Sequence, residues 1–294
     1  MMKLILQTIR ISFFSLAIIN LTAQEANPAD WRTIEMLAEE HPYIVALLDR
    51  EKVYSCTGTI INQRTVLTSG SCVKRDPNFV AVGAAAIENI LKTNMLLKIA
   101  FKRLHKDYAL EVNIDSDQII TQMYNNIGLI YTVKPHLELF VYSAVIGNYS
   151  ASELMKSRLL AVGYGKIKEH LVALQKQIYH QIPCKNPKWH YCVCGSEYTT
   201  GSKTYLQNFG EGGPILLDSL VVGIATFPCG SLAHRNLNDV YNIFTVIGPY
   251  LHWFDEPYSE PSLKFVSQEI NTSFQRRVGV ECFFLCLIVS KAIC

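Results

Sequence analysis

The sequence predicts an all-β barrel or sandwich of roughly 200 residues. Apolar residues in the middle of the chain come in short runs rather than in helical stripes, and a single helical pattern follows them near the end. The composition agrees with a large buried core, since 49% of the 294 residues are apolar and 18% are charged. These values exclude a disordered chain and a coiled coil.

Six apolar runs bounded by turn formers predict strands. They cover residues 43–48, 65–68, 79–82, 127–131, 159–162 and 220–225. A helix is predicted after them because large apolar residues recur at helical spacing. These residues are Val246, Ile247, Tyr250, Leu251, Trp253 and Phe254.

Residues 1–23 predict a cleaved signal peptide. Lys3 and Arg10 precede an apolar stretch that ends at Leu21-Thr22-Ala23, a candidate cleavage site. A buried helix or a membrane anchor is the alternative, although the stretch is short for a membrane span. The protein is therefore expected to be secreted and extracellular, with residues 24–40 as an N-terminal segment.

The charge of the mature chain gives no support for nucleic-acid binding. The formal charge of +2 is carried by Lys3 and Arg10, so removing the leader leaves equal numbers of basic and acidic residues. Asn148 and Asn271 each begin an Asn-x-Ser/Thr triplet, which predicts glycosylation in a secreted protein.

Residues 56–61 and 65–72 resemble the first landmark of trypsin-like serine proteases (chymotrypsin fold, S1 family), a Cys-Gly-Gly-Ser-Leu-Ile strand followed by Leu-Thr-Ala-Ala-His-Cys. Further matches follow in the family's order at residues 126–130, 163–165, 209–214, 220–227, 239–241 and 250–253. The resemblance assigns residues 41–254 to a trypsin-like domain. It implies two six-stranded antiparallel β-barrels and a C-terminal helix, with residues 255–294 as a C-terminal extension.

The same resemblance implies that the catalytic triad is replaced. Ser71 stands at the histidine position, Asn126 at the aspartate position and Glu211 at the nucleophile position. Serine is no base near neutral pH, an amide carries no charge, and a carboxylate attacks amides poorly. We therefore expect no catalytic residue at this site, and the enzyme status stays open.

Positions that support catalysis in the family also differ. Phe209 stands where the oxyanion hole has a glycine, and Tyr205 falls near the base of the specificity pocket. Gly210 replaces the aspartate that receives the new N-terminus on activation, and no Ile-Val-Gly-Gly lies upstream.

Two interpretations of the replaced triad stay open. Ser71, Asn126 and Glu211 form a substitute network in which the carboxylate accepts hydrogen bonds from both neighbours, or three unconstrained positions have drifted. Asp115 or Asp117 could be displaced triad partners, but the eight histidines all lie outside the matching motif. We expect no metal at Glu211, because no cluster of ligating residues accompanies it in sequence.

The resemblance also implies disulfides. Cys56 is expected to bond Cys72, Cys184 to bond Cys194 or Cys192, and the spare one of the last two to bond Cys229. A zinc site built from Cys184, Cys192, Cys194 and Cys229 is the alternative, which a secreted context disfavours. The odd ninth cysteine is expected among Cys282, Cys286 and Cys294.

The resemblance favours a secreted pseudoprotease that binds a protein partner. The expected partner is an active protease or its substrate, and no cofactor is expected. The alternative is a serine endopeptidase with a displaced or divergent active site. No transmembrane span is expected, although the apolar residues 282–289 after a polar spacer faintly resemble a lipid-anchor signal.

Overall fold

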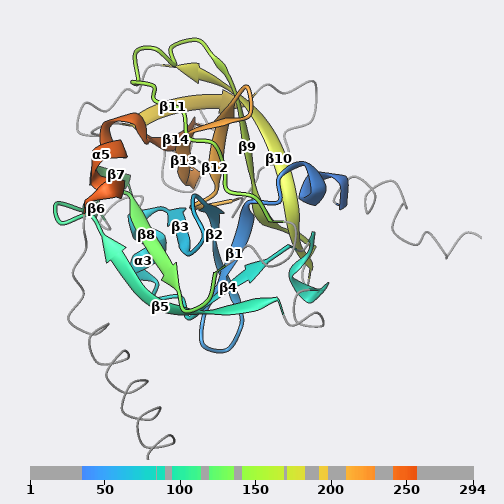
Figure 1. The fold of residues 1–294 in the computed structure, drawn as a ribbon. Helices are drawn as coiled ribbons and strands as arrows, with labels where there is room; N and C mark the ends of the chain where they lie inside the picture. The colour runs from blue at the N-terminus through green and yellow to red at the C-terminus, as the bar shows by residue number, and fades with distance from the viewer. Residues whose placement is uncertain are drawn as a thin grey trace, which may run out of the picture. The chain divides into compact units, whose positions relative to one another are not determined.

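Two closed six-stranded antiparallel barrels make up most of the part of the chain that the computed structural model describes (Figure 1). That part comprises residues 35–83, 85–89, 95–113, 119–135, 141–168, 171–182, 192–197, 210–228 and 241–256. The predicted all-β class and the two barrels implied by the resemblance are confirmed.

The first barrel closes in the strand order β1-β2-β3-β8-β5-β4. Its strands are β1 (Ile44–Leu48), β2 (Tyr54–Ile60), β3 (Thr65–Thr68), β4 (Phe79–Val82), β5 (Leu96–Leu104) and β8 (Gly128–Thr132). Every residue of β1 is buried, and Val45 and Leu47 pack in a core with Val66, Val80 and Ile130. The short helix α3 (Gly70–Lys74) follows β3.

The second barrel closes in the order β10-β11-β14-β13-β12-β9. Its strands are β9 (Arg158–Lys168), β10 (Leu171–Ile182), β11 (Cys192–Glu197), β12 (Pro214–Leu217), β13 (Leu220–Pro228) and β14 (Tyr241–Val246). Tyr179 and Phe244 meet edge to face in its core, with ring centroids 5.2 Å apart. A separate two-stranded sheet pairs β6 (Ala109–Asn113) with β7 (Ile119–Tyr124).

All six predicted runs lie on strands, namely β1, β3, β4, β8, β9 and β13. Two long strands were not predicted from apolar runs, because exposed or half-buried residues interrupt the buried ones along them. These are β5 and β10. A strand at a sheet surface alternates in this way and forms no continuous apolar run.

The predicted C-terminal helix begins later than its apolar pattern suggested. Val246 is the last residue of β14 and pairs with Gly223 across the second barrel. A 3-10 turn, η2 (Gly248–Tyr250), and α5 (Leu251–Asp255) then follow. Pro249 lies within this turn, and its ring fixes φ near the helical value.

The chain divides into two compact units, one ending at Pro249 and one beginning at Tyr250. In the second unit the Trp253 and Phe254 rings lie 6.0 Å apart, and Trp253 is buried. Over the described residues, no helix has both the length and the apolar character of a membrane span.

Candidate functional site

The residues at the three former triad positions come from three separate segments. Ser71 lies on α3, Asn126 lies between β7 and β8, and Glu211 lies in the loop before β12. The Ser71 amide donates a hydrogen bond of 2.9 Å to Asn126 Oδ1. The Ser71 hydroxyl donates one of 2.7 Å to Glu211 Oε1. Ser71 therefore links the other two residues across the two barrels.

Helix α3 positions Ser71 through its N-cap. The Ser69 hydroxyl accepts a hydrogen bond of 3.2 Å from the Cys72 amide and lies 2.9 Å from the Ser71 hydroxyl. A serine at the N-cap satisfies an amide that the first helical turn leaves without a partner. Both side chains are buried, so the Ser71 hydroxyl is held in place by its surroundings.

Arg75 supplies the positive charge of the site. Its Nη2 lies 2.5 Å from Glu211 Oε2. Its Nη1 donates to the Ser55 carbonyl at 3.0 Å and lies 3.2 Å from Cys56 Sγ. The sequence analysis missed this residue. The four-residue spacing from Ser71 was the available signal, because residues i and i+4 share one face of a helical turn.

Asn126 does not donate to Glu211, which corrects one part of the network hypothesis. Its Oδ1 accepts from the Ser71 amide, and this turns Nδ2 toward Met123 Sδ, 3.5 Å away. Arg75 takes the place that the network hypothesis gave to Asn126. The carboxylate thus bonds one hydroxyl and one guanidinium.

The Glu211 carboxylate is largely shielded from water, with 13% of its side chain exposed. Burial raises the pKa of Glu211, although the charge of Arg75 and the hydrogen bonds from Ser71 and Arg75 lower it. The effect of burial on the pKa therefore exceeds the combined effect of Arg75 and Ser71. Burial also raises the pKa of Tyr54 and of Tyr108, and the negative charge of Glu211 adds to both shifts.

Glycines around Glu211 allow its loop to lie directly on β2. Gly210 and Gly212 have φ of +60° and +85°. A Cβ on Gly212 would lie 2.3 Å from both the Thr57 carbonyl oxygen and Thr68 Oγ1. The Thr57 amide donates to the Glu211 carbonyl at 2.8 Å. The backbone of Glu211 is thus fixed against the first barrel. Glycine is required at position 212, where a Cβ would collide, and is favoured at position 210 by its positive φ.

A second set of hydrogen bonds joins the barrels beside this loop. The Tyr54 hydroxyl on β2 donates to the Tyr164 carbonyl on β9 at 2.8 Å, and the Tyr164 amide donates to Thr57 Oγ1 at 3.0 Å. The Gly210 amide also donates to the Tyr164 carbonyl, at 2.9 Å. These contacts hold β2, β9 and the Glu211 loop in register.

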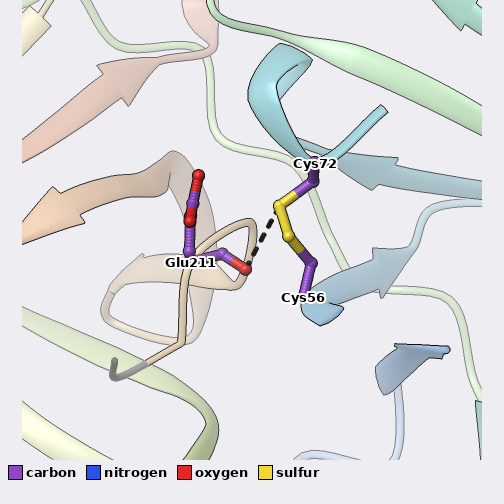
Figure 2. Close-up of side chains that lie close together, drawn as sticks. All are labelled: Cys56, Cys72 and Glu211. Carbon is purple, nitrogen blue, oxygen red and sulfur yellow. Dashed lines mark hydrogen bonds between the residues drawn. A yellow bond between two sulfur atoms is a disulfide. The ribbon is translucent and has the colours of Figure 1, made fainter. Parts of the chain in front are cut away.

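Cys56 and Cys72 form the disulfide that the resemblance implies. Figure 2 shows the Glu211 carbonyl directed at this bridge and the carboxylate directed away from it. The carbonyl oxygen lies 3.6 Å from Cys72 Sγ, which is a close contact because a disulfide sulfur has no proton to donate. The two sulfurs and the carboxylate do not suit a metal ion, since metals bind thiolates and both carboxylate oxygens are engaged.

The remaining predicted residues fall partly within the described chain. Cys194 is disulfide-bonded, and Asn148 is exposed. The side chain of Cys192 is not described. Outside the described residues lie the signal peptide 1–23, Asp115, Asp117, Cys184, Tyr205, Phe209, Cys229, Asn271 and the tail from residue 257.

Comparisons with known proteins place this geometry in context. The trypsin family model matches residues 32–254. No curated protein matches the sequence. Among solved structures, a complex of kallikrein-related peptidase 10 with Zn2+ shares 16% identity at a TM-score of 0.54, covering 74% of this chain and 95% of its own. Neuropsin, a serine protease expressed in the limbic system of mouse brain, shares 19% identity at the same TM-score, covering 74% and 94%. With a family model over most of its length and the two-barrel fold, the chain belongs to the trypsin family.

Proposed function

We propose that this chain is a secreted, non-catalytic member of the trypsin family that regulates proteolysis by binding a protein partner, an active protease or its substrate. One observation carries the proposal. The Glu211 carboxylate, at the family's nucleophile position, is held by the Ser71 hydroxyl and the Arg75 guanidinium.

The chemistry of this arrangement argues against peptide hydrolysis. The family mechanism needs a nucleophile whose proton passes to an adjacent base, which a third group orients. Here the residue at the base position donates its own proton toward a carboxylate, and the carboxylate is paired with a cation. The scaffold can persist without catalysis, because strand packing and the Cys56–Cys72 bridge do not depend on the triad.

Secretion is part of the proposal and has two supports among the described residues. The Cys56–Cys72 disulfide suits an oxidising compartment. Asn148 begins a glycosylation triplet and is exposed. The signal peptide at residues 1–23 is the sequence feature that would direct the chain there.

The second candidate is a serine endopeptidase with a divergent site, and the Ser71–Glu211 hydrogen bond is the observation in its favour. A serine bonded to a carboxylate has the connectivity of a nucleophile and a base. Two features weigh against it. Ser71 is 7% exposed, so a substrate carbonyl has little access, and the carboxylate is already paired with Arg75.

The test is the reaction of the purified mature protein with a fluorophosphonate probe and a broad panel of fluorogenic peptides. We expect neither labelling nor turnover. The matched controls are Ser71→Ala, which removes the only hydroxyl that could replace the nucleophile by this route, and active trypsin under the same conditions. Labelling that Ser71→Ala abolishes would overturn the proposal and establish the divergent site.

A further inference from the structure

We propose that Ser71 and Arg75 form a carboxylate-binding site, which Glu211 occupies as a tethered ligand and which an acidic group of a partner protein can occupy in its place. The inference rests on the proposed binding function and names the chemistry of the partner. A carboxylate already lies in the site, with a donor on each oxygen.

The donors are held by groups other than Glu211. The Ser71 amide is bonded to Asn126 Oδ1, and its hydroxyl lies 2.9 Å from the Ser69 hydroxyl. Arg75 is anchored through Nη1 to the Ser55 carbonyl. A site whose donors are fixed before the ligand arrives loses little conformational entropy on binding. The arrangement of the two donors is therefore expected to persist when the Glu211 carboxylate leaves.

The backbone of Glu211 is held by contacts that do not involve its side chain. The Glu211 carbonyl accepts from Thr57, and the Gly212 amide donates to the Ala225 carbonyl at 2.7 Å. These bonds hold the loop by its backbone alone, so the exchange we propose requires only a rotation of the Glu211 side chain. The Arg75 side chain is 44% exposed, whereas the Glu211 side chain and Ser71 are only 13% and 7% exposed, so the Ser71 hydroxyl becomes accessible only as the Glu211 side chain moves out. An incoming acidic group can thus approach from the side of Arg75.

Charge selects the class of ligand. Arg75 uses Nη1 for Ser55 and Cys56, and Nη2 for Glu211. Arg75 therefore offers a carboxylate one charge-assisted hydrogen bond, from Nη2, and the Ser71 hydroxyl offers the second donor. Exchange of one carboxylate for another keeps the charge of the site constant. The entropy lost by an untethered ligand is offset by the further contacts that a partner protein makes.

The experiment uses the full mature chain with Glu211→Ser, which removes the tethered carboxylate and introduces the residue that the family has at this position. Sodium acetate is the probe, with sodium chloride at equal ionic strength as its control, and the melting temperature is the readout. At an acetate concentration tenfold above its dissociation constant, mass action raises the melting temperature by roughly 3 to 6 °C.

The matched control is the double variant Glu211→Ser, Arg75→Ala, in which acetate should add nothing beyond chloride. The parent protein should also respond equally to both salts at neutral pH, because Glu211 fills the site. Equal responses of Glu211→Ser to acetate and chloride, or an acetate response that persists without Arg75, would refute the proposal. If Glu211→Ser does not fold, Glu211→Gly serves in its place, because glycine fits any backbone conformation at this position.

Two peptides then distinguish the source of the carboxylate. One carries an internal aspartate and an amidated C-terminus, and the other carries no acidic side chain and a free C-terminus. Calorimetric binding of the first to Glu211→Ser indicates an acidic side chain as the ligand, and binding of the second indicates a chain terminus. If neither binds in an Arg75-dependent manner, the partner chemistry proposed here is wrong. None of these measurements depends on peptidase activity, so their failure is separable from failure of the proposed function.

Discussion

The interior of the first barrel and the junction between the barrels are built from opposite kinds of residue. In the barrel interior, Leu47 and its neighbours are apolar and fully buried. At the junction, the described contacts include hydrogen bonds and the Arg75–Glu211 ion pair, made by Tyr54, Ser71 and Glu211 among others. The interior tolerates any apolar group of the right size, whereas each junction residue needs a particular partner.

This contrast separates the part of the molecule that fixes the fold from the part that distinguishes this chain within its family. The barrel interior is common to any protein with this architecture. The junction holds the replaced triad positions and the arginine that joins them. Substitutions in the two regions should therefore differ both in size and in dependence on pH.

The largest effect is expected from Leu47→Ala in the barrel interior. The side chain is fully buried, so its removal loses transfer free energy and leaves a cavity. We expect the free energy of unfolding to fall by about 2–5 kcal/mol in urea titrations. The control is Val53→Ala, where the side chain is 60% exposed and the change should stay within about 0.5 kcal/mol. Comparable losses for both variants would contradict the importance of this core.

The sequence predicts the barrel strands where their residues are continuously apolar. The run that contains Val45 and Leu47 is buried at every position of β1, so hydrophobicity alone finds it. It does not find β10, where buried Tyr179 and Gln181 flank half-buried His180. Nor does an apolar pattern show that Val246 ends a strand, because its pairing with Gly223 depends on the fold.

The candidate site was predictable only in part. Motif resemblance identified Ser71, Asn126 and Glu211, and these positions do come together. The hydrogen bond between Ser71 and Glu211 spans 140 residues of sequence, so local pattern cannot indicate it. Asn126 Oδ1 accepts from the Ser71 amide, and Glu211 Oε2 accepts from Arg75, because these donors are nearest in the folded chain. The sequence alone does not indicate which donors lie near these oxygens.

A smaller effect is expected at the junction from Tyr54→Phe. This change removes the hydroxyl that donates to the Tyr164 carbonyl and lies 3.0 Å from Thr57 Oγ1. The Tyr164 carbonyl still accepts from the Gly210 amide, and Thr57 Oγ1 still accepts from the Tyr164 amide, so neither partner is left without a hydrogen bond. The free energy of unfolding should therefore fall by about 0.5–1.5 kcal/mol. Tyr142→Phe is the matched control, because that side chain is 68% exposed. If Tyr54→Phe is neutral in urea titrations, the polar contacts do not hold the junction.

The smallest expected effect is a pH dependence carried by Glu211. Burial raises the pKa of this carboxyl in the folded protein, so the folded state binds the proton more readily than the unfolded state does. Stability gained from the neutral form is fully present below the ordinary carboxyl pKa and is lost as the pH rises through the folded-state pKa. Glu211→Gln lacks this titration. The free energy of unfolding of the parent minus that of Glu211→Gln should therefore decrease with rising pH across this window and stay level above it. The difference would instead increase with pH if the pairing with Arg75 outweighed burial. The ionised carboxylate would then stabilise the folded protein, rather than lower its stability through the loss of hydration.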